Sequence, residues 1–166
     1  MNAPSIAAIN GACFGVGLSL ACACDLRFCN INAKFSVAFT SIGLSPDSSL
    51  TYHLPKIVGL PRAIEMAILN RVLSSEEAKR YNLVSQIFGN EAPLLEEVTK
   101  IAKVISHGPT KAFGSTKLLF LNSFTNDLNT HLEEELKYVS MNATTEDFQE
   151  GINSFLENRK PVWKDE

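Results

Sequence analysis

Charge is missing from the beginning of this sequence. No residue from Met1 to Cys24 is acidic or basic, and Asp25 is the first charged side chain. A run of this length could be a signal peptide or a membrane span, but no Lys or Arg precedes it. Gly11, Gly15 and Gly17 also divide it into short pieces. We therefore expect a buried strand, a glycine-rich loop and a buried helix, and no membrane partner.

Basic clusters are missing as well. The 166 residues contain 15 Lys and Arg against 18 Asp and Glu, for a net charge of −3. No basic stripe with interleaved aromatic residues occurs, so nucleic acid is not an expected partner. With 45% hydrophobic and 20% charged residues, the chain is too apolar to be disordered. Its length fits one ordinary globular domain with a sizeable core.

Redox and zinc motifs do not occur. The cysteines Cys13, Cys22, Cys24 and Cys29 form no C-x-x-C pair, and the three histidines lie far away in sequence. Reduced, buried thiols that act as small hydrophobic side chains are the simplest interpretation. We expect no metal site, and the cysteine pattern fits a cytoplasmic protein.

Strand and helix patterns alternate through the first ninety residues. Such alternation predicts an α/β layer with parallel strands. Ser74 and Glu77 form a capping box at the start of one helix, and Asn82 suits its end. The expected strands are 4–9, 25–30, 34–37 and 83–88, a glycine loop covers 10–17, and the expected helices are 18–24, 48–58, 60–70 and one that starts at 74.

After Pro93 the pattern is helical throughout. Apolar residues such as Phe120, Leu121 and Phe124 are spread around more than one helix face, which is typical of helices that pack against a partner or another domain. Packing on the chain's own sheet and assembly with further copies both remain open. We divide the chain into an α/β part, 1–92, and a helical part, 93–166. The expected helices are 94–106, 109–122, 123–142 and 145–158.

The glycine loop is a candidate binding site. Its G-x-x-x-G-x-G spacing is neither a dinucleotide fingerprint nor a phosphate loop. It connects a strand to a helix that opens near Gly17, where backbone N–H groups have no partner within the helix. Such groups can stabilise a carbonyl oxygen that gains negative charge, as an oxyanion hole does. A tight packing turn is the alternative.

Three segments of the chain carry a resemblance: PSIAAINGACFGVGLSLACACDLRF, AKFSVAFTSIGLSPDSSLTYHLPKIVGLPRAIEMAILNRVLSSEEAKRYNLVSQIF and EGINSFLENRKPVW. They resemble one family, the crotonase or enoyl-CoA hydratase/isomerase superfamily. The resemblance implies a crotonase-like (ClpP/crotonase) α/β fold whose C-terminal helices build trimers or hexamers. It also implies an acyl-CoA thioester substrate, held by two backbone N–H groups, with no metal or separate cofactor.

The resemblance assigns roles to the glycine loop and the helix after it. The second oxyanion N–H falls on Val16, between Gly15 and Gly17. Hydratases of the family place two glutamates around a water, because addition across a double bond needs a base and an acid. Ser19 and Phe39 occupy those two positions. Water addition by the usual mechanism is therefore not expected.

Asp47 matches the position where isomerases of the family carry a single Asp or Glu. One carboxylate suffices for an allylic shift, because it can remove a proton from C2 of a 3-enoyl thioester and return it to C4. Phe39 and Leu44 are expected to keep this pocket apolar. The residues alone also allow a structural role for Asp47, as the N-cap of a helix that begins at Ser48.

The resemblance leaves other functions open. Dehalogenases of the family use the Asp47 position as a nucleophile, but with Trp near the position of Phe39. Complete members carry a substantial portion before the strand that starts at Pro4, which supplies the first oxyanion N–H. The sequence is thus expected to be an N-terminally truncated crotonase. We expect a Δ3 to Δ2 enoyl-CoA isomerase; the alternatives are a catalytically silent subunit, a hydratase or an aroyl-CoA dehalogenase.

Overall fold

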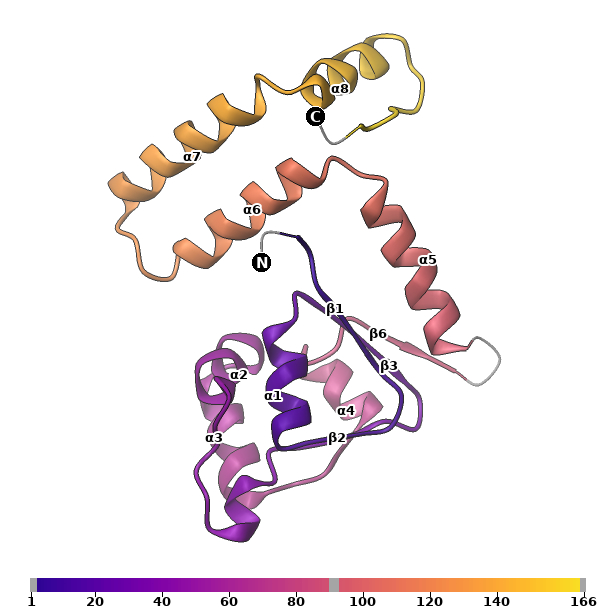
Figure 1. Ribbon diagram of the computed structural model, residues 1–166. Coiled ribbons are helices and arrows are strands. Elements are labelled where there is room, and N and C mark those ends of the chain that lie inside the picture. Colours follow the sequence, from indigo (N-terminus) through magenta and orange to yellow (C-terminus); the bar gives the residue numbers. More distant parts are fainter. Residues whose placement is uncertain (1–2, 90–92, 165–166) are drawn as a thin grey trace. The chain divides into compact units, whose positions relative to one another are not determined.

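The computed structural model describes residues 3–89 and 93–164, which belong to two compact units (Figure 1). The α/β unit spans Ser5–Ile101. The helical unit comprises Met1–Pro4 together with Ala102–Glu166.

A three-stranded parallel sheet organises the α/β unit. Strand β3 (Leu26–Asn30) lies between β1 (Ile6–Ile9) and β6 (Gln86–Phe88), and both neighbours run parallel to it. Parallel neighbours need long crossover connections, which here contain the helices of the unit. The predicted α/β layer with parallel strands is confirmed.

A second small sheet contains strand β2 (Ala12–Phe14), which the sequence predicts as part of a loop. It pairs in parallel with β4 (Lys34–Ser36), and β5 (Leu73–Ser74) adds antiparallel to β4. The prediction of a loop over 10–17 is therefore wrong for its central residues. Strands this short exist only because distant segments supply their hydrogen-bond partners, so no local pattern marks them.

Helices cover the sheets of the α/β unit and bury its core. Helix α1 (Val16–Ala23) packs against α2 (Leu50–Val58), and α2 packs against α3 (Leu60–Leu69). A short 3-10 helix, η1 (Phe39–Ile42), follows β4. The large apolar side chains that are almost completely buried are Leu18, Phe35, Leu50, Met66, Leu73 and Leu83.

Helix α4 (Ser75–Arg80) begins as the sequence predicts. The hydroxyl of Ser74 accepts a hydrogen bond from the Glu77 N–H, and the Glu77 carboxylate accepts one from the Ser74 N–H. Asn82 then adopts a φ of 59° after the helix end. The capping box and the left-handed Asn82 are both confirmed.

Helix α5 (Leu94–Ser106) adds a small second core to the α/β unit. Leu94 and Val98 of its first turns bury against Phe28 of β3 and Phe88 of β6. The rings of Phe28 and Phe88 lie 6.1 Å apart between centroids. The helix has the bounds that the sequence predicts.

The helical unit contains α6 (Thr110–Asn122), α7 (Leu128–Asn142) and α8 (Glu146–Leu156), and α6 packs against α7 (Figure 1). The predicted helix over 123–142 starts too early, because the Asp127 carboxylate caps α7 by accepting hydrogen bonds from the N–H groups of Asn129 and Thr130. Within residues 3–89 and 93–164, no helix is long and apolar enough to cross a membrane.

Candidate functional site

The first part of the candidate site is the glycine turn that starts α1. Gly15 has φ 53° and ψ −121°, a backbone conformation that glycine adopts far more readily than other residues. Its N–H donates a hydrogen bond to the Ser36 carbonyl at 3.1 Å, which fastens the turn to β4. Val16 is the first helical residue, followed by Gly17. The Val16 N–H therefore has no acceptor within the helix and lies at the positive end of its dipole.

An aromatic ring lies beside this turn. A Cβ on Gly15 would lie 3.9 Å from the buried ring of Phe39. Ala38, at φ 63°, turns the chain from β4 into η1. Leu44 is connected to this helix because its N–H donates to the Phe39 carbonyl at 3.1 Å. Phe39 thus forms an apolar wall next to Gly15, whereas the side chain of Leu44 is 55% exposed.

Asn70 fixes the position of this wall. Its side-chain oxygen accepts a hydrogen bond from the Ala38 N–H at 2.8 Å, and it lies 3.4 Å from the Ser36 hydroxyl. Asn70 itself adopts a φ of 49° at the end of α3. The sequence predicts Asn70 as the last residue of this helix, which ends one residue earlier, and no sequence signal indicates the contact with Ala38, which is 32 residues away.

Ser19 connects the glycine turn to Asp47. Its side chain is completely buried, and its hydroxyl lies 3.3 Å from the Gly15 carbonyl oxygen and 3.2 Å from the Asp47 carbonyl oxygen. One hydroxyl proton is thus shared between two backbone acceptors that lie 32 residues apart. The sequence gives Ser19 only as a replacement for a hydratase glutamate, and this connecting role appears only in the tertiary structure.

Asp47 lies in a segment with unusual backbone angles. Ser48 and Ser49, which follow it, have φ values of 50° and 64°. Consecutive non-glycine residues with positive φ are uncommon, and such conformations cluster at functional sites. Helix α2 begins at Leu50 with Ser49 as its N-cap. The alternative that Asp47 caps a helix beginning at Ser48 is therefore wrong.

The Asp47 carboxylate is left for contact with a ligand or water. Its residue is exposed, and among the residues that the structure describes none donates a hydrogen bond to this carboxylate. The site thus combines a backbone N–H at Val16, an apolar wall at Phe39 and a carboxylate at Asp47, and Ser19 joins the backbones of Gly15 and Asp47. A donor for an oxyanion and a single carboxylate are the groups that proton transfer next to a carbonyl requires.

The buried thiols do not add a nucleophile. The four cysteines are free, as predicted. Burial raises the pKa of Cys13 to about 11 and that of Cys22 to about 12. These thiols stay protonated at neutral pH, and the thiolate is the reactive form. In the described ranges, no cluster of His, Cys, Asp and Glu side chains is suited to holding a metal ion.

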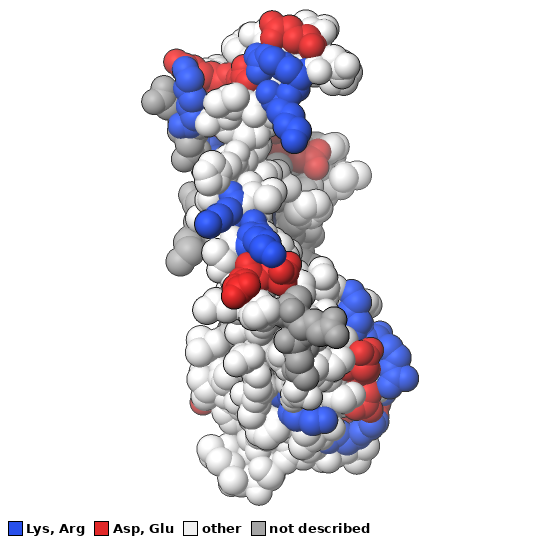
Figure 2. Space-filling view, turned by 90° about the vertical axis from the view of Figure 1, so that its right-hand side faces the viewer, with Lys and Arg blue, Asp and Glu red and all other residues white. Residues whose placement is uncertain are grey.

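Charged side chains on the face shown in Figure 2 lie in small mixed clusters of both signs. On and near α3, Glu65 forms ion pairs with both Arg62 and Arg71. The face therefore presents no broad basic surface.

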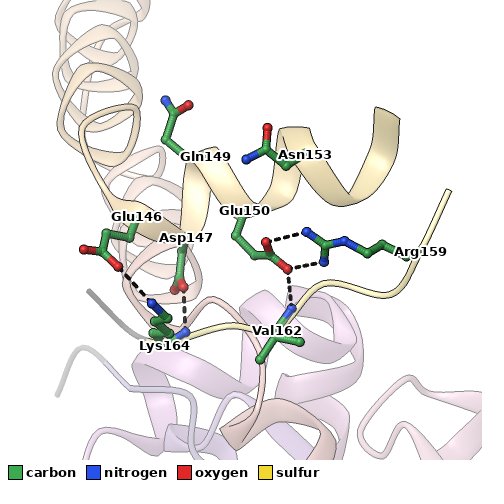
Figure 3. A pocket seen from close by; sticks show the side chains of 8 residues that line it. All are labelled: Glu146, Asp147, Gln149, Glu150, Asn153, Arg159, Val162 and Lys164. Atoms are coloured by element: carbon green, nitrogen blue, oxygen red, sulfur yellow. Dashed lines mark hydrogen bonds and ion pairs between the residues drawn. The ribbon is translucent and has the colours of Figure 1, made fainter. Parts of the chain in front are cut away.

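A polar cavity of about 500 Å³ lies in the helical unit (Figure 3). Arg159 donates two hydrogen bonds to the Glu150 carboxylate, at 2.5 and 2.8 Å, and the Val162 N–H donates to the same group at 2.7 Å. The Lys164 N–H donates to the buried Asp147 at 2.8 Å. These charges fasten residues 159–164 to α8. We call this segment the C-terminal clasp and assign it a structural role.

The clasp should open in acid. Hydrogen bonds from Arg159 lower the pKa of Glu150 to about 2, from an ordinary value of 4.5. Because the folded-state pKa is the lower one, the interaction stabilises the clasp above pH 4.5 and is lost as the pH falls through about 2. Trp163, the single tryptophan, packs against Gly151. The fluorescence emission of Trp163 should therefore shift to longer wavelength as the pH falls from 4.5 through about 2.

A substitution tests the same contact at neutral pH. Glu150→Gln should produce the red shift at pH 7, because the amide cannot form the ion pair with Arg159. Glu157→Gln is the matched control, since Glu157 also contacts Arg159 but is 60% exposed and does not bind the Val162 N–H. If Glu150→Gln leaves the emission unchanged, packing of Trp163 alone holds the clasp.

The whole chain, residues 1–166, matches the profile of a family described as Enoyl-CoA hydratase/isomerase. It is 34% identical over 158 residues to 1,2-epoxyphenylacetyl-CoA isomerase of Escherichia coli strain K12, covering 95% of this chain and 60% of the relative. It is 35% identical over 152 residues to 4-chlorobenzoyl coenzyme A dehalogenase-1 of an Arthrobacter species, covering 92% and 55%.

Solved structures are also similar. A crystal structure of an enoyl-CoA hydratase/isomerase from Mycobacterium abscessus superposes with a TM-score of 0.95 at 33% identity, covering 99% of this chain and 63% of that chain. The chain thus spans between 55% and 63% of the length of these three proteins.

Proposed function

The chain belongs to the enoyl-CoA hydratase/isomerase family and has the crotonase fold, and on this basis we propose that it is an acyl-CoA isomerase. The reaction is the shift of a double bond from the Δ3 to the Δ2 position of an enoyl-CoA or a related ring-derived acyl-CoA. One observation carries the proposal: Asp47, which supplies a single carboxylate, accepts a hydrogen bond from Ser19 at its backbone carbonyl, and the same hydroxyl contacts the Gly15 carbonyl in the turn that presents the Val16 N–H.

The proposed mechanism uses these groups in two proton transfers. The thioester carbonyl oxygen accepts a hydrogen bond from the Val16 N–H. The Asp47 carboxylate removes a proton from C2, and the resulting negative charge on the oxygen is stabilised by that N–H. The double bond moves to C2–C3 when Asp47 returns the proton to C4. CoA is part of the substrate, and the mechanism needs no metal or separate cofactor.

Isomerisation is favoured over water addition by the residues at two positions. Phe39 has no proton to exchange, and the Ser19 hydroxyl is engaged with two backbone carbonyls. Neither residue can act as the second acid or base that hydration needs. The dehalogenase alternative uses Asp47 as a nucleophile, and a catalytically silent subunit uses none of these groups.

Turnover of a 3-enoyl-CoA by the purified chain tests the proposal directly. The conjugated 2-enoyl thioester that forms absorbs in the ultraviolet, so its appearance gives the rate. Loss of that absorbance from added 2-enoyl-CoA measures hydration, and halide release from 4-chlorobenzoyl-CoA measures dehalogenation. Binding of acyl-CoA without any of the three reactions would favour the silent subunit and contradict the isomerase.

Removal of the Ser19 hydroxyl should lower the isomerisation rate without removing a reacting group. We expect Ser19→Ala to reduce kcat about tenfold, because Asp47 and the glycine turn lose their connection, and to cost about 1 kcal/mol of stability. Ser75→Ala is a matched control, since Ser75 is equally buried and donates to the Ile31 carbonyl elsewhere. A similar loss of kcat in both variants would show a general stability effect and contradict this role.

We also propose that residues 93–166 form an oligomerisation region beside an α/β core of 1–92, and that copies assemble into a trimer or hexamer. Exposed apolar side chains on α7, among them Leu132, Leu136 and Val139, support this assembly. The four free thiols support a cytoplasmic location. The proposed reaction supports a place in fatty acid metabolism.

A further inference from the structure

An apolar cavity of about 190 Å³ lies in the α/β unit next to the Asp47 segment. Pro46 and Leu50, which flank that segment, both line it, and so does Val37 at the end of β4. The remaining walls come from α2 and α3, where the lining includes Thr51 and Ala67. Residues on both sides of Asp47 in the sequence therefore line the cavity.

The lining of the cavity selects an apolar occupant. No lining residue is charged, and Thr51 is the one that carries a hydroxyl. An apolar cavity of about 150 Å³ can stay dry and bind a molecule such as benzene. A carboxylate or the phosphates of CoA would lose their hydration here without compensation. A hydrocarbon chain would not.

The size of the cavity argues against a protein segment as the occupant. One turn of an α-helix is about 5.4 Å long and about 10 Å across with its side chains. The cavity, of about 190 Å³, is comparable with a cavity of about 150 Å³ that holds a single benzene molecule, which has six carbons. A few methylene groups fit this volume better than a helix of a second copy.

We propose that this cavity receives the distal carbons of the acyl group, and that Thr51 and Ala67 limit the chain length that fits. The inference rests on the proposed function, which puts the reacting carbons at Asp47. Thr51 on α2 and Ala67 on α3 are small lining residues, as is Ala63 on α3. The Ala67 carbonyl accepts a hydrogen bond from the Thr40 hydroxyl at 2.6 Å, which holds this wall against η1.

Binding of saturated acyl-CoAs to the full chain tests this proposal separately from catalysis. Butanoyl-CoA and octanoyl-CoA have no double bond to shift, so calorimetric titration reports binding alone. Each buried methylene should improve affinity about fourfold, so octanoyl-CoA, with its four additional methylenes, should bind up to about 250-fold more tightly than butanoyl-CoA. Ala67→Leu places three more carbons in the cavity. It should reduce the preference for octanoyl-CoA over butanoyl-CoA to about threefold.

Further variants keep the test decisive. Thr51→Leu fills the cavity from α2 and should have the same effect as Ala67→Leu. Ala23→Leu is the control, because Ala23 is exposed at the end of α1 and does not line the cavity. Circular dichroism and thermal unfolding check that every variant folds.

Several outcomes would overturn the inference. The first is that the parent chain does not bind octanoyl-CoA. The second is that both cavity variants keep the parent's ratio of octanoyl-CoA to butanoyl-CoA affinity. The third is that the cavity variants bind acyl-CoA as the parent does but sediment with a different oligomeric state. If the parent chain fails to isomerise a 3-enoyl-CoA but the cavity variants abolish the preference for octanoyl-CoA, the proposed function fails and this inference stands. If the parent chain isomerises a 3-enoyl-CoA but the cavity variants keep the preference for octanoyl-CoA, this inference fails and the proposed function stands.

Discussion

Replacing Asp47 with asparagine should abolish isomerisation and leave acyl-CoA binding intact. The amide has the same shape as the carboxylate but cannot take up a proton from C2. General acid–base groups contribute about 10²–10⁴ to rate, and here one carboxylate serves both transfers, so we expect kcat to fall by about 10³ or more. The measurement is the rate of 2-enoyl-CoA formation, beside the Kd of a saturated acyl-CoA.

The Asp47→Asn result needs a control carboxylate. Glu76→Gln removes one negative charge from an exposed position in the first turn of α4, outside the proposed site. Its kcat should match that of the parent chain. If Asp47→Asn retains more than about a tenth of the parent rate, Asp47 is not the base, whatever the fold.

Gly15→Ala should reduce both stability and activity. Alanine at φ 53° and ψ −121° is strained whatever space surrounds it, and Phe39 leaves enough room for the methyl group. The cost is therefore backbone strain, about 2 kcal/mol, which corresponds to a fall in Tm of about 5 °C. If the turn relaxes, the Val16 N–H moves, and loss of one oxyanion donor lowers kcat about 10²–10³-fold.

Gly11→Ala is the matched control for Gly15→Ala. Gly11 lies in the same glycine-rich segment, its φ is not positive, and an added Cβ would meet nothing within 4 Å. Its Tm and kcat should be close to those of the parent chain. A Gly15→Ala variant with lowered Tm but full kcat would contradict the assignment of Val16 as oxyanion donor.

The sequence predicts the long elements of this fold well because their signals are local. Helix α5 has its predicted bounds, and α4 begins at the predicted capping box. An amphipathic period or a cap depends only on residues within a few positions. The same holds for the thiols of Cys13, Cys22 and Cys29, whose burial follows from an apolar segment without C-x-x-C pairs, whereas Cys24 is only partly buried.

Short strands and the start of α2 depend on distant residues and are predicted less well. Strand β2 is three residues long and exists because β4 pairs with it. The segment before α2 looks like helix in sequence, but Ser48 and Ser49 have positive φ values, so the helix begins two residues later than predicted. In both cases, contacts between remote segments override local preference.

The sequence by itself determined the family resemblance, the parallel α/β layer and the residue types at Val16, Ser19 and Asp47. Only the tertiary structure decided that Asp47 is not a helix cap and that the Ser19 hydroxyl connects it to Gly15. It also decided that an apolar cavity lies beside this segment. The physical reason is range: periodicity, caps and glycine spacing act over a few residues, whereas a shared hydroxyl or a cavity requires segments that only the fold brings together.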